Sequence, residues 1–241
     1  MRNTASPAPP ANGRELNRIL LALPSVEYDS LSGDMEATSL EPRQMLYLPS
    51  AAITHVYFPQ SCVASVLAVD NDGDKVEVIT VGREGMVGMA LVHGFDSSPN
   101  ECFIQIVGDG KRMLAEAFTR QLPDLPMLQR LLQRYADALF NSAAQSVVCN
   151  RHHSVMQRCA RWLLMTDDRV AGKDFALTQE FLSYMLAARR PSVSQAAGSL
   201  QTDGLIEYSR GVMRILDRSG LEAASCECYD ITRASHDRVF E

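Results

Sequence analysis

The sequence predicts an α+β protein, with antiparallel strands in the N-terminal half, a long central helix, and a helix-turn-helix with a β-hairpin near the C-terminus. Three observations lead to this prediction. Apolar and β-branched runs alternate with turn signals between Thr38 and Gly110, as in an antiparallel roll or barrel. Beyond Leu125 the apolar spacing changes to alternating fours and threes. Between Thr178 and Leu216, two short amphipathic helices precede two short strands.

Composition places the chain among soluble globular proteins. Of its 241 residues, 46% are hydrophobic and 22% are charged, and no apolar run approaches the roughly 18 residues that a membrane helix needs. The formal net charge of −6 argues against a protein that coats nucleic acid indiscriminately, although a DNA reader depends only on its local field. Six cysteines without a C-x-x-C pair are typical of reduced thiols. We therefore predict a cytoplasmic protein with no membrane partner.

The N-terminal part divides into a tail and a β-rich domain. Residues 1–13 are rich in Pro and Ala, which predicts a disordered tail. Apolar side chains at i, i+3, i+4 and i+7 from Leu16 to Leu23 predict a short helix, and a second is plausible around residues 26–31. We assign residues 14–124 to the β-rich domain. Its predicted strands span residues 45–48, 53–58, 63–69, 75–81 and 101–107.

Two glycine-containing turns of this domain resemble ligand-binding motifs but have the wrong spacing. The run from Asp70 to Asp74 resembles the start of a calcium loop, but Gly73 is its fourth residue where the motif has glycine at the sixth. We predict a hairpin tip there. Gly82, Gly85 and Gly88 do not have the spacing of a dinucleotide-binding turn, and no helix after a parallel strand is predicted at this point.

The spacing beyond Leu125 predicts a long helix from Pro126 to about Arg151 that pairs two subunits. Ser154 and Gln157 form a capping-box pattern, so a new helix should begin there, after a hinge at residues 152–153. We assign residues 125–153 to this dimerisation helix and hinge, and we expect a homodimer that Leu132→Glu would break. The predicted interface comprises Leu128, Leu132, Tyr135, Leu139, Ser142, Ser146 and Cys149.

Cys149 and His153 stand at i and i+4, so they could share a metal or a haem. No third ligand lies close in sequence, and we favour the interpretation that one is a seam residue and the other a hinge residue. We accordingly predict no metal site and no cofactor. Residues 223–241, which include Cys226 and Cys228, are assigned to a C-terminal tail without a functional account.

Residues 154–222 carry the most specific pattern of the chain. Thr178 is a candidate N-cap for a short helix, because its hydroxyl can accept from backbone donors one turn later. The apolar pattern breaks at residues 187–190, and Pro191 suits the first turn of a second helix. The inward face of this second helix is predicted to comprise Val193, Ala196, Ala197 and Leu200.

The opposite face of the second helix has the properties of a DNA-reading surface. A helix in the major groove needs hydrogen-bonding side chains toward the bases and cations where phosphates approach. This face carries short or medium polar side chains and follows two arginines. Gly204 is expected to end the helix, and strands on either side of residues 209–211 form a wing. The predicted DNA-binding residues are Thr178, Arg189, Arg190, Ser192, Gln195, Ser199 and Arg210.

The runs LTQEFLSYMLAARRPSVSQAAGSLQTDGLI and YSRG…ILDRSGLE resemble the C-terminal domain of the Crp/Fnr family of bacterial transcription regulators. The resemblance implies a winged helix-turn-helix, double-stranded DNA and RNA polymerase as partners, and base-reading positions at Arg190, Pro191 and Gln195. Better-known members carry a charged residue at the position of Pro191. The DNA sequence recognised by this chain should therefore differ from theirs.

The runs VYFPQSCVASVLAV and DKVEVITVGREGMVG resemble the same family's sensor domain, a double-stranded β-roll. Cyclic-nucleotide-binding members carry a Gly-Glu pair and, further on, an Arg-Ser or Arg-Thr pair. Here Met89 follows Gly88, and the later position falls near Asn100 and Glu101, so we predict no usual binding of cyclic AMP. The N-terminal cysteine cluster of the iron–sulfur members is absent too. The effector stays unknown, and the candidate pocket residues are Gly88, Met89 and Asn100.

These observations favour a homodimeric DNA-binding transcription regulator over two alternatives. A metal-barrel enzyme usually needs two or three histidines with a carboxylate, but the predicted strand region contains only His55 and His93, far apart in sequence. We therefore predict no catalytic residues. A DNA-silent ligand-binding or protein-interaction module of the same fold stays open, and DNA-binding experiments would separate it from the regulator.

Overall fold

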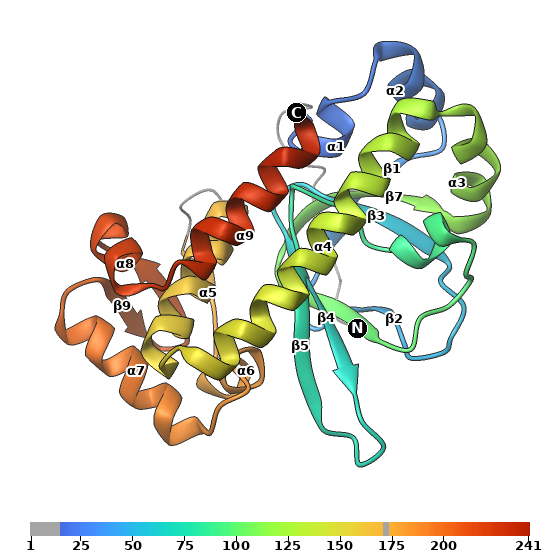
Figure 1. Cartoon of the computed structure of the whole chain (residues 1–241). Helices are drawn as coiled ribbons and strands as arrows, with labels where there is room; N and C mark the ends of the chain where they lie inside the picture. Colours follow the sequence, from blue (N-terminus) through green and yellow to red (C-terminus); the bar gives the residue numbers. More distant parts are fainter. Residues whose placement is uncertain (1–14, 171–173) are drawn as a thin grey trace, which may run out of the picture.

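The computed structural model describes residues 15–170 and 174–241, and the predicted tail of residues 1–13 lies outside them. The β-rich N-terminal part and the helical C-terminal part lie at opposite ends of the molecule, and helix α4 (Pro126–His152) runs between them (Figure 1). Helix α9 (Cys228–Asp237) lies alongside α4. No helix in the described ranges combines the length and apolar character of a membrane span.

The N-terminal part contains two antiparallel sheets, as the sequence predicts. One has the strand order β1-β7-β3 and the other β2-β6-β4-β5. Two of the strands have no predicted counterpart, because β1 is EATSL and β7 contains two glycines, so neither shows an apolar alternation. The strands are β1 (Glu36–Leu40), β2 (Met45–Tyr47), β3 (His55–Pro59), β4 (Val63–Val69), β5 (Lys75–Val81), β6 (Glu101–Ile106) and β7 (Gly108–Leu114).

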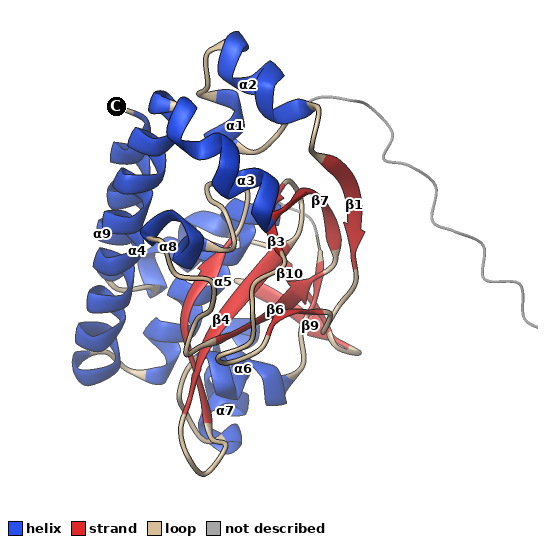
Figure 2. Ribbon diagram, turned by 90° about the vertical axis from the view of Figure 1, so that its right-hand side faces the viewer, coloured by secondary structure: helices blue, strands red, loops and turns tan. Residues whose placement is uncertain are grey.

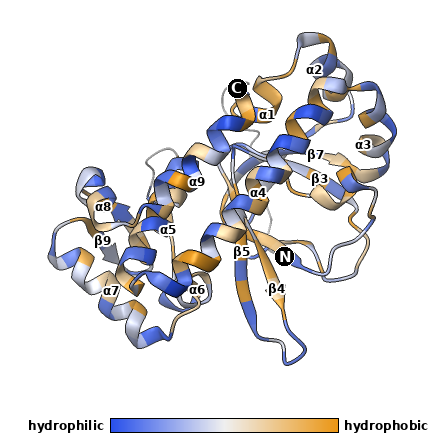
Figure 3. Ribbon diagram, viewed as in Figure 1, coloured by the Kyte–Doolittle hydropathy of each residue, from blue (hydrophilic) through white to orange (hydrophobic). Residues whose placement is uncertain are grey.

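The β4–β5 turn is a hairpin tip, as predicted. The Asp70 carboxylate accepts from the backbone N–H groups of Asp72 and Asp74 at 3.0 and 2.9 Å. Gly73 adopts a left-handed φ of 85°, which glycine tolerates without a Cβ clash. The hairpin carries hydrophobic residues along β4 and hydrophilic ones at its tip (Figure 3).

Helices and short 3-10 turns flank the sheets and form most of the C-terminal part (Figure 2). Helix α5 begins with the predicted capping box, since the Ser154 N–H donates to Gln157 Oε1 at 3.0 Å and the Gln157 N–H donates to Ser154 Oγ at 3.2 Å. The helices and 3-10 turns not yet given are α1 (Arg18–Leu21), α2 (Ser25–Ser32), η1 (Met89–His93), α3 (Ala115–Gln121), η2 (Leu122–Asp124), α5 (Val155–Val170), α6 (Gln179–Met185), α7 (Arg190–Thr202), α8 (Arg218–Ala224) and η3 (Arg238–Phe240). The remaining strands are β8 (Phe175–Ala176), β9 (Ile206–Ser209) and β10 (Val212–Ile215).

The seam of α4 that was predicted to face a second subunit is covered within the chain itself. Leu128, Leu132 and Tyr135 are fully buried, and they join one apolar cluster with residues of the first sheet and of the C-terminal segment. Ser142 is within 3.0 Å of His236 Nε2 on α9. Leu139 and Cys149 are buried and Ser146 is half-buried. The C-terminal residues, assigned to a tail from sequence, thus supply a helix that covers α4.

A different side of α4 is left open. Phe140 and Val147 are each 71% exposed, and Val148 is 45% exposed. Together with Ala144, which is also exposed, they are spaced i, i+4, i+7 and i+8, so they form one apolar stripe along the helix. We call these four residues the outer stripe of α4.

The glycines between β5 and η1 allow the helices to approach the roll closely. A Cβ at Gly85 would lie 1.9 Å from the Tyr135 hydroxyl oxygen, and a Cβ at Gly82 would lie 2.5 Å from Arg169 Cγ. Gly88 has a φ of 105°. The Gly82–Gly88 spacing is therefore explained by close packing against α4 and α5 and by one left-handed residue.

The C-terminal part rests on the second sheet. The Trp162 indole N–H donates to Glu77 Oε1 at 3.0 Å, and the rings of Phe103 and Phe181 meet edge to face at 5.4 Å. A buried ion pair joins Arg169 Nε and Glu84 Oε1 at 2.8 Å. These contacts fix α5 and α6 against the β-roll of the same chain.

Candidate nucleic-acid interface and metal-ligand cluster

Helices α6 and α7 form the predicted helix-turn-helix. Thr178 is the N-cap of α6, and its Oγ1 accepts from the Phe181 N–H at 3.1 Å. The turn contains Ala187 with a φ of 44°, a left-handed value that costs a residue with a Cβ some strain. Helix α7 begins at Arg190, and Pro191 stands in its first turn, where no backbone donor is needed.

The two sides of α7 lie as the apolar spacing predicts. Val193 and Leu200 are fully buried, Ala196 and Ala197 are buried beside them, and the small alanines bring the helix close to its support. The αL residue Gly204 follows the C-cap Asp203, and its neighbour Leu205 donates its N–H to the Leu200 carbonyl at 3.0 Å. The opposite side is exposed, and it carries Arg189, Arg190, Pro191, Ser192, Gln195 and Ser199.

The wing is a tight hairpin of β9 and β10. Ser209 pairs with Val212, so the turn has two residues, Arg210 and Gly211, with φ values of 51° and 78°. Positive φ at both positions is the signature of a type I′ turn, whose twist suits a hairpin. Arg210 is exposed at the tip, as predicted.

The exposed cations near α7 differ in their partners. Arg190 forms an ion pair with Glu180 of α6, and both side chains are half or more exposed. Arg214 in the wing is paired with Asp174 and Glu207. Arg189 and Arg210 have no ion-pair partner among residues 15–170 and 174–241.

A cleft separates the N-terminus of α6 from the second sheet. Its volume is about 380 Å³, and its walls include Lys75 and Glu101 of the roll and Thr178 and Glu180 of the helix-turn-helix. Thr178, predicted to contact DNA, therefore faces the β-roll of its own chain. Whether it also contacts DNA stays a prediction.

The candidate effector residues lie at the ends of elements of the β-roll, and their contact with an effector stays a prediction. Gly88 precedes η1, half-buried Met89 packs against the α4 cluster, and half-buried Asn100 precedes β6. Glu101, expected to repel a phosphate, is buried and pairs with Lys75 Nζ at 2.7 Å. This pairing weakens the electrostatic argument against an anionic ligand, while the missing Gly-Glu and Arg-Ser pairs are unaffected by it.

The prediction of no metal site and no cofactor is contradicted by a cluster of four potential ligands. Cys149, His153, Cys226 and Cys228 offer one donor atom each, all within 4.8 Å of one another. Cys149 and His153 alone do not predict a metal site, because no third ligand lies close to them in the sequence. The third and fourth ligands are Cys228, the first residue of α9, and Cys226, two positions before it. Helix α9 packs along α4, and Cys226 Sγ lies 3.6 Å from Cys149 Sγ.

Neighbouring polar groups orient this cluster. The Gln145 amide nitrogen donates to Cys228 Sγ at 3.1 Å, and His153 Nε2 lies 3.3 Å from Glu227 Oε1. Burial raises the pKa of the Cys226 thiol to about 12, and it raises the pKa of Cys149 as well. In the absence of a cation, both thiols therefore hold their protons at neutral pH.

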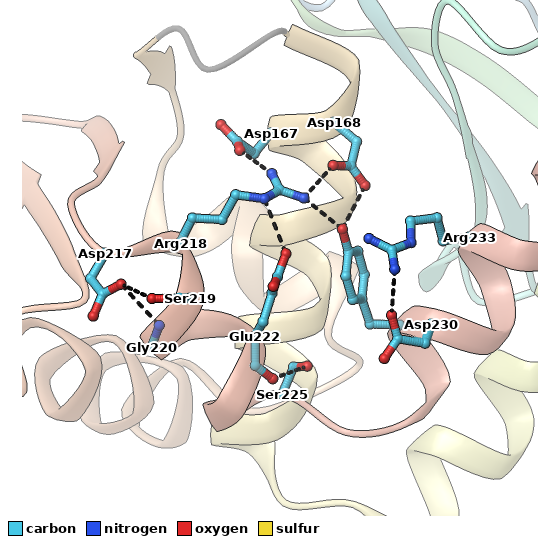
Figure 4. A network of polar contacts seen from close by, with 11 residues as sticks. Asp167, Asp168, Asp217, Arg218, Ser219, Gly220, Glu222, Ser225, Asp230 and Arg233 are labelled. Carbon is cyan, nitrogen blue, oxygen red and sulfur yellow. Dashed lines mark hydrogen bonds and ion pairs between the residues drawn. The ribbon is translucent and has the colours of Figure 1, made fainter.

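A second polar network, missed from sequence, ties the C-terminal segment to α5. Figure 4 shows the Arg218 guanidinium between Asp167 and Asp168 of α5. Arg218 also donates to Glu222 at 3.1 Å and to the Tyr229 hydroxyl at 2.6 Å. The signal in the sequence is weak, because Arg218 lies about fifty positions from Asp167 and Asp168.

Comparison with known proteins identifies the C-terminal domain. Residues 157–224 match the model of the Crp-like helix-turn-helix domain. No curated protein sequence matches the chain.

Solved structures match four fifths or more of the chain at low identity. The FixK2 protein of Bradyrhizobium japonicum has a TM-score of 0.66 at 17% identity, covering 80% of this chain and 98% of its own. A putative transcriptional regulator of the Crp/Fnr family from Eubacterium rectale has 0.65 at 15% identity, covering 86% and 97%. The c-di-GMP-responsive global regulator CLP of Xanthomonas campestris has 0.63 at 14% identity, covering 80% and 99%. The chain thus has the fold of Crp/Fnr-family transcriptional regulators and carries a Crp-like helix-turn-helix DNA-binding domain.

Proposed function

We propose that the protein is a homodimeric, cytoplasmic transcription regulator, and not an enzyme, that reads a near-palindromic DNA site. Two copies of α7 enter successive major grooves about one helical turn apart. The observation that carries this proposal is the division of α7 into a buried apolar side and an exposed side led by arginines.

The exposed residues of α7 divide into base contacts and phosphate contacts. Gln195 and Arg190 have the side chains that pair with adenine and guanine edges in the major groove. Arg189 at the N-cap of α7 and Arg210 at the wing tip contact phosphates, and Ser192 and Ser199 add hydrogen bonds. Arg190 has to leave its ion pair with Glu180 before it contacts DNA. In the free protein, the charge of the Arg190 guanidinium is therefore partly neutralised by Glu180.

The outer stripe of α4 is the surface on which we place the dimer contact. The predicted seam is already covered by the roll and α9, whereas Phe140, Ala144, Val147 and Val148 offer an uninterrupted apolar strip to a second copy of α4. Two such helices in parallel would bury both strips against each other. The β-roll then serves as the sensor of an unidentified signal, and the DNA-bound dimer has RNA polymerase as its protein partner.

Selection of bound fragments from genomic DNA, followed by gel shifts, tests this proposal. We expect binding to a limited set of fragments that share an inverted repeat, with an affinity that falls steeply as salt rises. Equal binding to all fragments, or none, would contradict the proposal and favour a DNA-silent module of the same fold.

A further inference from the structure

We propose that Cys149, His153, Cys226 and Cys228 form a tetrahedral Zn²⁺ site that fastens the junction of α4 and α5 to the start of α9. Three thiolates and one imidazole are a common ligand set for structural zinc. The cysteines are buried, and His153 is largely shielded from solvent. A closed, four-ligand site is therefore available without an open position for water.

The distances within the cluster agree with one tetrahedral ion. Cys149 Sγ lies 3.6 Å from Cys226 Sγ, and His153 Nδ1 lies 3.4 Å from Cys228 Sγ. With Zn–S near 2.3 Å and Zn–N near 2.0 Å, tetrahedral geometry places two donors about 3.5–3.8 Å apart. The widest pair, within 4.8 Å, has to close by about one ångström, a small side-chain adjustment.

The groups around the cluster are those that support a bound metal. Glu227 faces His153 Nε2 at 3.3 Å, which leaves Nδ1 as the ligand atom, as in carboxylate–histidine–zinc arrangements. The Gln145 amide donates to Cys228 Sγ and would stabilise its thiolate. Arg161 lines the same cavity as Cys149, and its charge offsets the net negative charge of three thiolates on a divalent ion.

The compactness of the cluster favours a single ion over an iron–sulfur centre. An iron–sulfur cluster distributes its protein ligands over several irons, so their donor atoms stand further apart than those bound to one ion. Four donors within 4.8 Å of one another enclose one cation. Zn²⁺ suits such a mixed thiolate and imidazole set and needs no redox chemistry.

The position of the site gives it a consequence for DNA binding, which rests on the proposed function. Cys149 lies in the last turn of α4, His153 is the C-cap of that helix, and Ser154 is the capping residue directly before α5. A cation held there joins the end of α4 and its C-cap His153 to the segment that leads from the helix-turn-helix domain into α9, so it limits how that domain turns relative to α4. Loss of zinc frees this junction and changes the affinity for DNA.

Metal analysis of the full-length protein, purified anaerobically under reducing conditions, tests the site. We expect about one zinc per chain, and replacement by Co²⁺ should give the absorption of tetrahedral cobalt with thiolate charge transfer. Cys226→Ala and Cys228→Ala should abolish both signals, whereas Cys159→Ala, which removes a buried thiol outside the cluster, should keep them. Zinc added to metal-free wild-type protein should raise its unfolding temperature, a measurement that needs no variant to fold.

Three results would overturn the assignment: no zinc bound after exposure to Zn²⁺, unchanged zinc in Cys228→Ala, or iron with inorganic sulfide in place of zinc. A disulfide between Cys149 and Cys226 in the anaerobic protein would overturn it as well. Gel shifts with zinc-loaded and zinc-free protein form a separate arm, in which we expect at least a fivefold difference in affinity. Equal affinity of both forms would contradict the hinge role, and binding of no fragment by either form would contradict the proposed function, without changing the zinc count.

Discussion

Helices α4 and α7 were both predicted from apolar spacing, yet their surroundings differ. On α7, the apolar residues support the helix within its own domain and the polar residues face outward, as expected. On α4, the apolar seam is buried, but the residues that cover it belong to the same chain. Apolar periodicity therefore predicts which side of a helix is covered and leaves open what covers it.

The physical reason lies in where the covering residues stand in the sequence. The support of α7 is local, since α6 and the wing are its immediate neighbours in the chain. The cover of α4 comes from strands before it and from α9, whose His236 lies 94 positions after its α4 partner Ser142. No local sequence pattern predicts such a distant contact. The heptad spacing of α4 is instead typical of a seam between two chains.

The largest expected effect is that of Leu132→Glu. Leu132 is completely buried against the β-roll, so a carboxylate there would have to be buried without a partner. We expect a loss of about 4 kcal/mol or more in the free energy of unfolding, enough to unfold much of the protein. Urea unfolding followed by circular dichroism measures this loss.

Phe140→Glu is the matched variant on the other side of α4. Phe140 is 71% exposed in the single chain, so its replacement should change the free energy of unfolding by less than about 0.5 kcal/mol. It should nevertheless convert a dimer to a monomer in sedimentation velocity. A folded, dimeric Phe140→Glu would move the subunit contact away from the outer stripe.

The contrast between local and long-range contacts also decides which parts of the candidate sites can be predicted from sequence. Thr178, Pro191, Gly204 and the capping box are signals contained within a few residues, and each lies where it was expected. The Cys/His cluster depends on the contact between His153 and Cys228, which lie 75 positions apart. The C-x-C spacing of Cys226 and Cys228 alone does not predict this contact. Strand β1 was missed because its side chains are mostly exposed and polar.

A second prediction concerns the contact between α5 and the second sheet, in which the Trp162 indole donates to Glu77. Burial raises the pKa of Glu77 to about 7, while hydrogen bonds from Ser65 and Trp162 and the charges of Arg169 and Arg161 oppose this shift. The folded state thus binds the proton more tightly than the unfolded state. Stability from this group is present below about pH 4.5 and is lost as the pH rises to about 7, by roughly 3 kcal/mol at most.

Glu77→Gln isolates this titration from all others. The amide keeps a hydrogen-bonding group beside Trp162 but carries no charge, so the variant should be less sensitive to pH between about 4.5 and 7 than the wild type. Urea unfolding at pH 5 and pH 8 gives both differences. If the two proteins lose stability in parallel, Glu77 is not the group responsible.

A third prediction tests the reading face of α7 directly. Gln195→Ala should cost about 1–3 kcal/mol at particular base pairs, because a bidentate base contact is lost. Arg210→Ala should weaken binding more evenly across sequences, since a phosphate contact carries no base information. Gel shifts on a set of single-base variants of the selected site distinguish the two patterns. Unchanged affinity and preference in Gln195→Ala would remove this residue from the interface.

The smallest expected effect is that of Glu180→Gln. This variant tests whether the polar side of α7 contributes to DNA binding without contributing to the stability of the domain. Glu180 is half exposed and pairs with Arg190, so its neutralisation should leave the free energy of unfolding within about 0.5 kcal/mol of the wild type. It releases Arg190 for DNA and removes a negative charge from the approach of the phosphates. We expect an affinity gain of up to about 1 kcal/mol, which gel shifts at two salt concentrations can resolve. Glu180 serves α7 only as the partner of an exposed cation. A lower free energy of unfolding in Glu180→Gln would therefore show that the polar face of α7 stabilises the domain, as the buried seam of α4 does.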